Sequence, residues 1–326
     1  MMPNSPVFPP TASKLAPQLD ALYFFMLGGA VFFSILIVVT ILAFISRYRR
    51  RSEDEVGQVI EGKATKVLEI TWTVIPLALL MVSFFWGLRI FFSAARPPAD
   101  AAQFYVVGKQ WMWKIEHPEG KREINQLHVP VGMPVKLTMT SEDVIHNFAI
   151  PAFRLKMDVL PGRYTTAWFE ATKKGTYHIF CDQYCGVEHA KMVGQVVVME
   201  PAEYRAWLAG QAAGTGPVAS GAELFQAKAC GTCHRSDSSA RAPILDGAFG
   251  KPVALLDGKS VPFDETYARE SIVNPQAKVV QGYQPIMPTY KDQLTEEEVI
   301  QLIKHIKSLT PQAPAPAEGG SAAGRS

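Results

Sequence analysis

Residues 21–46 have the sequence ALYFFMLGGAVFFSILIVVTILAFIS, which contains no charged side chain. A helix of about 20 apolar residues crosses a bilayer, so this stretch is long enough to do so. A second uncharged run, ITWTVIPLALLMVSFFWGL, covers residues 70–88, and IFF follows after Arg89. Its internal Pro76 is tolerated where neighbouring helices satisfy the freed backbone groups. We therefore predict two membrane spans, 21–46 and 70–92, that form a helical hairpin.

The loop between the two runs is rich in basic residues. A cleaved signal peptide is the alternative for the first run, but only Lys14 precedes it, where a signal peptide needs a basic region. The positive-inside rule places the basic loop in the cytoplasm. The N-terminus and everything after residue 93 would then lie on the periplasmic side of a bacterial inner (plasma) membrane, where thiols can pair, bind metal or attach haem. The basic residues of the loop are Arg47, Arg49, Arg50, Arg51, Lys63 and Lys66.

Composition narrows the class of protein further. The chain has 326 residues, 32 Lys and Arg against 30 Asp and Glu, and a formal net charge of +2. A hydrophobic fraction of 48% excludes a disordered chain, and the balanced charge gives no support to nucleic-acid binding. Four cysteines are too few for a disulfide scaffold in a chain of this length. They occur as two close pairs, and both pairs have neighbours that indicate redox chemistry.

The part of the chain after the N-terminal segment and hairpin (1–98) divides into regions of different composition. Residues 99–208 contain short segments rich in β-branched and aromatic residues, punctuated by Pro and Gly, which predict an antiparallel β-sandwich or barrel. Residues 209–220 are small and uncharged, as is typical of a flexible linker. The pattern of residues 221–311 is helical and predicts an all-α domain. The low-complexity tail, 312–326, is predicted to be disordered.

The predicted helical domain contains Cys230-Gly-Thr-Cys233-His234. Cys-x-x-Cys-His is a c-type haem attachment pattern, in which both thiols bond to the haem and the His ligates its iron. A thioredoxin-like dithiol would need a βαβ context, and a zinc site would need further ligands, although no Cys follows. The other axial ligand should be a Met or a His. Met287 is the only Met after the linker, whereas its rival, His305, lies off the apolar stripe of the last helix.

The other pair lies in Cys181-Asp-Gln-Tyr-Cys185-Gly-Val-Glu-His189-Ala-Lys-Met192, and His146 stands upstream. Thiolate, thioether and imidazole groups together are a copper donor set. Because a mononuclear blue-copper site uses one Cys, the additional Cys indicates two copper ions bridged by both thiolates. The alternative is a plain Cys181–Cys185 disulfide, which would leave His189 and Met192 without a role.

Both motifs carry family resemblances. The helical domain resembles a class I cytochrome c, in which a Pro carbonyl supports the proximal His and a Met-Pro pair supplies the distal sulfur; this implies these roles for Pro243 and Met287. Residues from about 20 to 210 resemble cytochrome c oxidase subunit II, whose dinuclear copper centre is called CuA. The stretches that match are EITWTVIP at 69–76, GKQWMW at 108–113, LKMDVLPGR at 155–163 and the cysteine loop.

The subunit II resemblance implies roles for individual residues. Trp111 would be where electrons enter beside the copper, although Trp111 and Trp113 alternate along a predicted strand and could share a core face. Glu69 would lie near the mouth of a proton path in subunit I, or be an ordinary interfacial charge. In many members of the family, position 183 is a Glu whose carboxylate also holds Mg²⁺ or Mn²⁺. Here the residue is the neutral Gln183, which puts that cation site in question. The implied copper ligands are His146, Cys181, the backbone carbonyl of Gln183, Cys185, His189 and Met192.

Together these features imply a multidomain membrane protein with a two-helix hairpin, a cupredoxin-like sandwich and a cytochrome c domain. We expect subunit II of a haem–copper oxidase, which takes electrons from an external cytochrome c or another periplasmic donor. They would pass from its own haem c to CuA and on to haem in subunit I, for dioxygen reduction coupled to proton translocation. Subunits I and III are the expected partners, and dioxygen chemistry would lie in subunit I because the two spans contain no His.

Three other classes of protein share parts of this pattern. A quinol oxidase subunit would lack the copper ligands, and a nitrous oxide reductase would lack the membrane hairpin. A membrane-anchored redox carrier that works outside an oxidase stays open. It would be distinguished by the absence of a large multi-span subunit from the purified complex.

Overall fold

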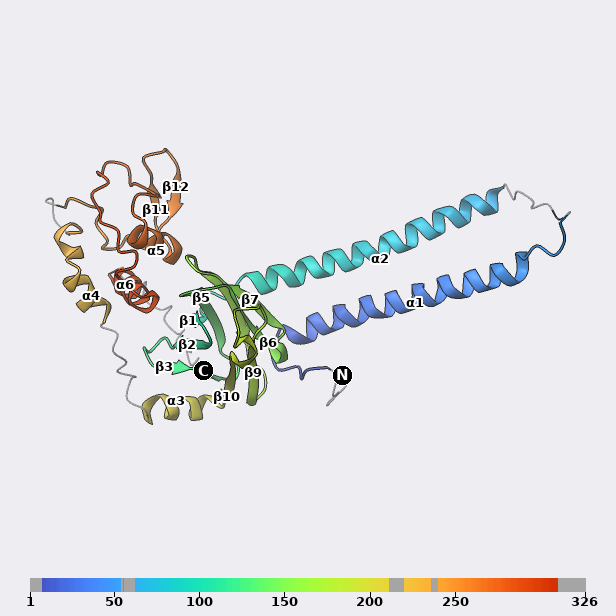
Figure 1. Cartoon of the computed structure of the whole chain (residues 1–326), viewed down its shortest axis with the longest axis horizontal. Helices are drawn as coiled ribbons and strands as arrows, with labels where there is room; N and C mark the ends of the chain where they lie inside the picture. Colours follow the sequence, from blue (N-terminus) through green and yellow to red (C-terminus); the bar gives the residue numbers. More distant parts are fainter. Residues whose placement is uncertain (1–7, 54, 56–61, 211–219, 236–239, 310–326) are drawn as a thin grey trace, which may run out of the picture.

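The computed structural model describes residues 8–53, 55, 62–210, 220–235 and 240–309. Two long helices, α1 (Ala16–Tyr48) and α2 (Lys63–Ala95), lie side by side and project from the rest of the molecule (Figure 1). Each has 33 residues and is therefore about 50 Å long, more than the roughly 30 Å of a bilayer's hydrocarbon core. Most of their apolar side chains are exposed. Both predicted spans thus lie in apolar helices long enough to cross a membrane.

Two five-stranded sheets pack face to face and form the predicted β-sandwich. The first sheet has the order β3-β2-β1-β5-β8, and the second has the order β4-β10-β9-β6-β7. The first contains β1 (Ala102–Lys109), β2 (Met112–Glu116), β3 (Arg122–Ile124), β5 (Pro134–Ser141) and β8 (Thr165–Glu170). The second contains β4 (Gln126–Pro130), β6 (His146–Ile150), β7 (Leu155–Val159), β9 (Gly175–Cys181) and β10 (Val193–Met199).

The sandwich is not antiparallel throughout. The pairs β1–β5 and β4–β10 are parallel, so the prediction of an antiparallel sandwich is wrong for these two pairs. Antiparallel neighbours can be joined by a tight hairpin, but parallel neighbours need a longer crossing connection. Here the chain changes sheets between β4 and β5, which brings β5 beside β1 in the same direction. Strand composition predicted the strands but carried no signal for this crossing.

A helical segment follows the sandwich. The short helix α3 (Pro201–Gly210) was not predicted and includes the first two residues of the predicted linker. Residues 211–219 of that linker and the predicted tail, 312–326, lie outside the described residues. We call residues 220–309 the C-terminal segment. It contains α4 (Gly221–Ala227), the 3-10 turn η3 (Cys230–Thr232), α5 (Glu265–Val273) and α6 (Glu296–Ser308).

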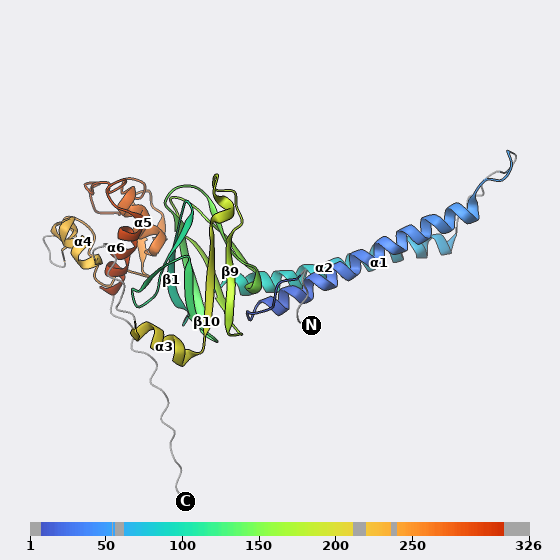
Figure 2. The same cartoon turned by 60° about the horizontal axis from the view of Figure 1, so that its bottom comes forward.

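The C-terminal segment is mainly helical, but it also contains a two-stranded sheet of β11 (Pro252–Ala254) and β12 (Ser260–Pro262). The prediction of an all-α domain therefore missed this short hairpin, whose strands are too brief to show an alternating pattern. The side chain of Thr295 caps the start of α6. The apolar stripe of α6 faces the core of the C-terminal segment. The helices α5 and α6 lie beside the sheet that contains β1 (Figure 2).

Candidate metal centres

The cysteine-rich stretch connects β9 to β10. Cys181 is the last residue of β9, and Met192 immediately precedes β10. The backbone amide of Cys181 donates to the carbonyl of Met192 at 3.1 Å, which closes the ends of the loop. His189 begins a short 3-10 turn, η2 (His189–Lys191), that directs the chain back toward the sheet. The fold thus brings both ends of this stretch together at one end of the sandwich.

Three side chains of this loop lie around the sulfur atom of a fourth, Cys185. The Sγ of Cys185 lies 3.7 Å from the Sγ of Cys181, 3.4 Å from the Nδ1 of His189 and 3.8 Å from the Sδ of Met192. Cys181, Cys185 and Met192 are buried in the core of the sandwich. The two sulfur atoms are much farther apart than the ~2.0 Å of a disulfide bond, and both cysteines are free.

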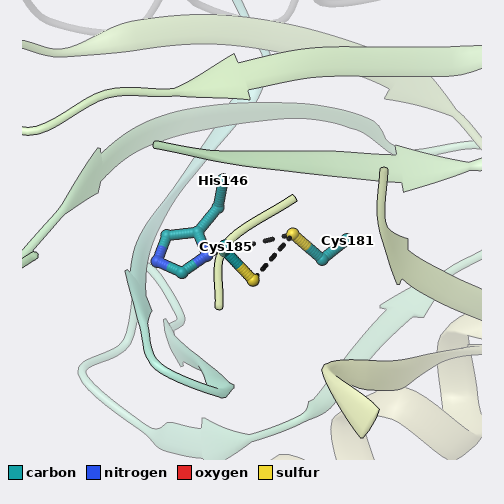
Figure 3. A group of neighbouring side chains, drawn as sticks. All are labelled: His146, Cys181 and Cys185. Atoms are coloured by element: carbon teal, nitrogen blue, oxygen red, sulfur yellow. Dashed lines mark hydrogen bonds between the residues drawn. The ribbon is translucent and has the colours of Figure 1, made fainter. Parts of the chain in front are cut away.

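The remaining two donors both lie close to the sulfur atom of Cys181. Its Sγ lies 3.9 Å from the Nδ1 of His146, which comes from β6 (Figure 3). Its Sγ also lies 3.2 Å from the backbone carbonyl oxygen of Gln183, whose side chain is exposed. The ligand atoms of His146, Cys181 and Cys185 all lie within 4.8 Å of one another. The structure therefore brings together all six predicted copper donors.

His146 is held by residues that the sequence did not single out. Its Nε2 lies 2.8 Å from a carboxylate oxygen of Asp143, so Nδ1 is left to face the cysteines. Asp143 also accepts from the backbone amide of Gln110 at 2.8 Å. A Cβ on Gly108 would come within 3.0 Å of the His146 ring, so only glycine lets β1 pass this closely. Nothing in the local pattern around Asp143 distinguishes it from an ordinary turn residue.

The two thiols differ in acidity. Burial raises the pKa of Cys181, but hydrogen bonds, chiefly with His146, outweigh it and lower the pKa to about 6. Burial raises the pKa of Cys185 to about 12, and the neighbouring Cys181 adds to this effect. A cation that both thiolates bind must therefore displace the proton of Cys185, the less acidic of the two thiols.

Trp111 lies in the turn between β1 and β2, whereas Trp113 is fully buried within β2. The expectation that both alternate along one strand is therefore wrong, because the chain reverses direction at Trp111. The indole Nε1 of Trp111 donates to the backbone carbonyl of Cys185 at 3.3 Å. The side chain of Gln110 donates to the same carbonyl at 2.8 Å. This turn therefore contacts the cysteine loop through two hydrogen bonds. The sequence predicted a role for Trp111 but none for Gln110.

The C-terminal segment surrounds a cavity of about 860 Å³. Cys230, Cys233 and His234 lie on its wall together with Met287, whereas His305 is not among the lining residues. His305 packs against the ring of Phe225 instead, with ring centroids 5.1 Å apart. A large cavity with mostly apolar walls and a few convergent polar groups is the usual form of a cofactor site.

The predicted proximal His is oriented by the backbone. The Nδ1 of His234 donates to the carbonyl of Pro243 at 2.7 Å, which leaves Nε2 free to bind a metal. Burial lowers the pKa of His234, and this favours the neutral imidazole that ligates iron. The donor set and the cavity therefore fit a haem.

Glu69 belongs to neither cluster. It lies near the start of α2, whose other end contacts the sandwich through Ser93 and Trp168, and its side chain is exposed. Its backbone carbonyl accepts from Thr73, one turn along the helix. The described residues bring no other predicted site residue to it, so any role of Glu69 depends on what covers this helix.

Comparison with known proteins gives matches in all three parts of the chain. Residues 2–90 match the family "Cytochrome C oxidase subunit II, transmembrane domain", and residues 122–200 match "Cytochrome C oxidase subunit II, periplasmic domain". Residues 218–310 match the family "Cytochrome c". These matched domains imply a CuA copper site and a haem c, which agrees with the two donor clusters.

Two curated relatives agree with these matches. The cytochrome c oxidase subunit 2 of Alkalihalophilus pseudofirmus is 29% identical over 311 residues, which cover 90% of this chain and 88% of that protein. The cytochrome c oxidase subunit 2 of Thermostichus vulcanus is 31% identical over 268 residues, which cover 65% of this chain and 81% of that protein. A crystal structure of the periplasmic domain of subunit II of cytochrome oxidase from Bradyrhizobium japonicum covers 35% of this chain and 96% of its own, with 32% identity and a TM-score of 0.34.

Proposed function

Because the chain belongs to the cytochrome c oxidase subunit II family and carries a C-terminal cytochrome c domain, we propose that it is the electron-accepting subunit of a haem–copper oxidase. Electrons from a periplasmic donor would pass from its own haem c to a dinuclear copper centre and on to haem in subunit I. Dioxygen reduction and the coupled proton translocation would take place in subunit I, with subunit III as a further partner. The sandwich and the C-terminal segment would lie on the outer side of a bacterial inner membrane.

The observation that carries this proposal is the gathering of six donors of the right chemistry at one end of the sandwich. Two thiols within 3.7 Å of each other can both contact the same two metal ions. Sulfur and imidazole donors favour copper over hard cations. Asp143 fixes the tautomer and the orientation of His146, as carboxylates do around metal-bound imidazoles.

In the C-terminal segment we assign each residue around the cavity a separate task. Cys230 and Cys233 would attach the haem covalently, and His234 and Met287 would bind its iron. The carbonyl of Pro243 holds the ring of His234 in place. When bound, the two cofactors supply one-electron redox chemistry that no side chain here provides.

Three lesser roles belong to the same proposal. Trp111 would receive or relay electrons at the cysteine loop, because its indole contacts the backbone of Cys185. Glu69 would serve proton uptake together with subunit I. Gln183 would donate its carbonyl to copper but would not support a Mg²⁺ or Mn²⁺ site, because its side chain is a neutral ligand.

The test is metal analysis of a soluble fragment that begins at residue 99. We expect two copper ions and one covalent haem per chain, and an electron paramagnetic resonance spectrum in which one unpaired electron is shared by both coppers. The Cys185→Ser variant is the matched control and should lose that spectrum while it keeps the haem. A haem-bearing fragment without copper, in which Cys181 and Cys185 form a disulfide, would overturn the proposal.

A further inference from the structure

Strand β1 is buried on both of its faces. Phe104 and Val106 point into the core of the sandwich, between the two sheets. Tyr105 and Val107 point the other way, yet they are only 4% and 2% exposed, and they join the apolar cluster of α5 and α6. Along a strand of a sandwich, residues that face the core normally alternate with residues that are exposed to solvent on the outer face. This face is instead built to be covered, and the C-terminal segment covers it.

Charged groups surround this apolar contact. The carboxylate of Glu116 on β2, whose side chain is 8% exposed, accepts from the amide of Gln301 at 2.9 and 2.8 Å. The ammonium group of Lys304, one turn further along α6, donates to the same carboxylate at 2.5 Å. A nearly buried carboxylate is costly unless it is paired and hydrogen-bonded, and the partners here are supplied by α6 and by Arg122.

A second charged contact lies toward the copper-donor end of the sandwich. Lys114 on β2 donates to Glu297 at the start of α6, at 2.5 Å, and to Glu142 of the sandwich, at 2.9 Å. Glu142 directly precedes Asp143, the residue that holds His146. The start of α6 is therefore tied to the connection that positions a predicted copper ligand.

A third contact fixes α5. Arg269 on α5 is buried and donates to the backbone carbonyl of Gly162 in the sandwich at 2.7 Å. The same guanidinium group also pairs with Glu296 of α6 and lies over the ring of Tyr164. Because these donors point in several directions, the contact restricts both the position and the rotation of the C-terminal segment.

We propose that α6 is a docking helix, and that its contacts with Glu116 and Lys114 hold the C-terminal segment in one fixed position on the sandwich. Electrons would then cross within a standing complex rather than during repeated encounters at the end of a tether. This proposal rests on the proposed function for its redox meaning, but the docking itself does not depend on it. A linker alone would only raise the local concentration of one domain near the other.

The docking can be tested in the full chain by inserting a protease site into residues 211–219 and cleaving the protein in its membranes. At low ionic strength we expect the C-terminal segment to stay bound to the membrane fraction, as followed by haem absorbance. At about 1 M salt, where the screening length is about 3 Å, its release should increase.

Reversing a charge on α6 distinguishes a docked C-terminal segment from one that is only tethered by the linker. Lys304→Glu places a carboxylate opposite Glu116, and we expect at least tenfold more released segment at low salt. Glu116→Gln, on the sandwich side, should act in the same direction and so guards against a folding defect of α6. The matched control is Lys259→Glu, which makes the same charge change at an exposed residue of the β11–β12 turn and should release no more than the parent.

Release of the parent segment at low salt, or equal release from Lys304→Glu and Lys259→Glu, would overturn the docking proposal. In the uncleaved chain, photoreduction of the haem should show electron transfer to copper that is at least tenfold slower in Lys304→Glu. An unchanged rate, despite increased release after cleavage, would overturn the standing complex while leaving the docking surface intact. Haem absorbance and copper resonance are recorded on the same samples, and their absence would count against the proposed function instead.

Discussion

The two candidate centres are built in opposite ways. In the sandwich, the donor atoms of Cys181, Cys185 and Met192 are themselves part of a packed apolar core. In the C-terminal segment, the corresponding residues line a cavity of about 860 Å³. The first centre is thus a cluster that the protein packs by itself, and the second is a space that a large group must fill. From this difference we expect the sandwich to fold without a bound metal and the C-terminal segment to need a haem for its stability.

The largest effect should follow from blocking haem attachment. In Cys230→Ala with Cys233→Ala, we expect the C-terminal segment to lose its protease resistance while the sandwich keeps it. Without a haem, the mostly apolar walls of this cavity of about 860 Å³ would lose the burial that a large group gives them. The whole stability of a domain is only about 5–15 kcal/mol, so this loss should be enough to unfold the segment. Limited proteolysis with haem staining measures this. A haem-free segment that resists proteolysis would remove the contrast between the two centres.

A smaller effect is expected from the equivalent change in the sandwich. Cys181→Ala with Cys185→Ala removes the same number of thiols, and we expect copper binding to be lost while the fold is retained. Each substitution deletes one buried sulfur, which should cost about 0.5–1.5 kcal/mol, as for the loss of other single buried groups. Urea unfolding of a fragment covering 99–210, followed by circular dichroism, gives the stability. Unfolding of this variant in water would show that the metal, and not packing, organises the loop.

The same contrast explains what could be predicted from sequence. The four donor side chains between Cys181 and Met192 and the haem attachment motif could be predicted from residue type and local spacing. His146, which lies 35 positions before Cys181, was predicted as a ligand through the family resemblance. Gln110 and Asp143 were missed because their roles depend on the β1–β2 turn meeting the cysteine loop. The parallel pairing of β1 with β5 was missed for the same reason, since it depends on the route of the chain between the sheets.

The docking of the C-terminal segment was equally invisible in sequence. Lys114, Glu116 and Lys304 are ordinary surface types, and nothing in their local pattern shows that they meet. The outward residues Tyr105 and Val107 also gave no signal of a covered face, because aromatic and β-branched residues are common in exposed strands too. Contacts between regions distant in sequence carry little local signal.

The stability of the sandwich also rests on polar contacts of its own. Glu123 on β3 is bracketed by two histidines: the Nε2 of His117 and the Nδ1 of His128 each lie 2.6 Å from one of its carboxylate oxygens. The ring of His117 is fully buried and also contacts the hydroxyl of Tyr204 on α3 at 3.0 Å. Burial raises the pKa of Glu123, but hydrogen bonds from His117 and His128 outweigh it and lower the pKa to about 2.

These contacts predict a dependence of stability on acid that involves neither cofactor. A carboxyl group whose folded-state pKa lies below its unfolded value stabilises the fold above the unfolded pKa, and this contribution disappears as the pH falls toward the folded pKa. For Glu123 the window runs from about pH 4.5 to about pH 2. The full shift corresponds to about 3 kcal/mol. Because solvent partly screens this carboxylate, we expect the copper-free 99–210 fragment to lose about 2 kcal/mol of unfolding free energy across this window through Glu123. Glu123→Gln should start less stable and show a shallower decline in urea titrations. If both proteins lose stability in parallel, the stability of the sandwich in acid is governed by other carboxylates, and Glu123 only fills space between two histidines.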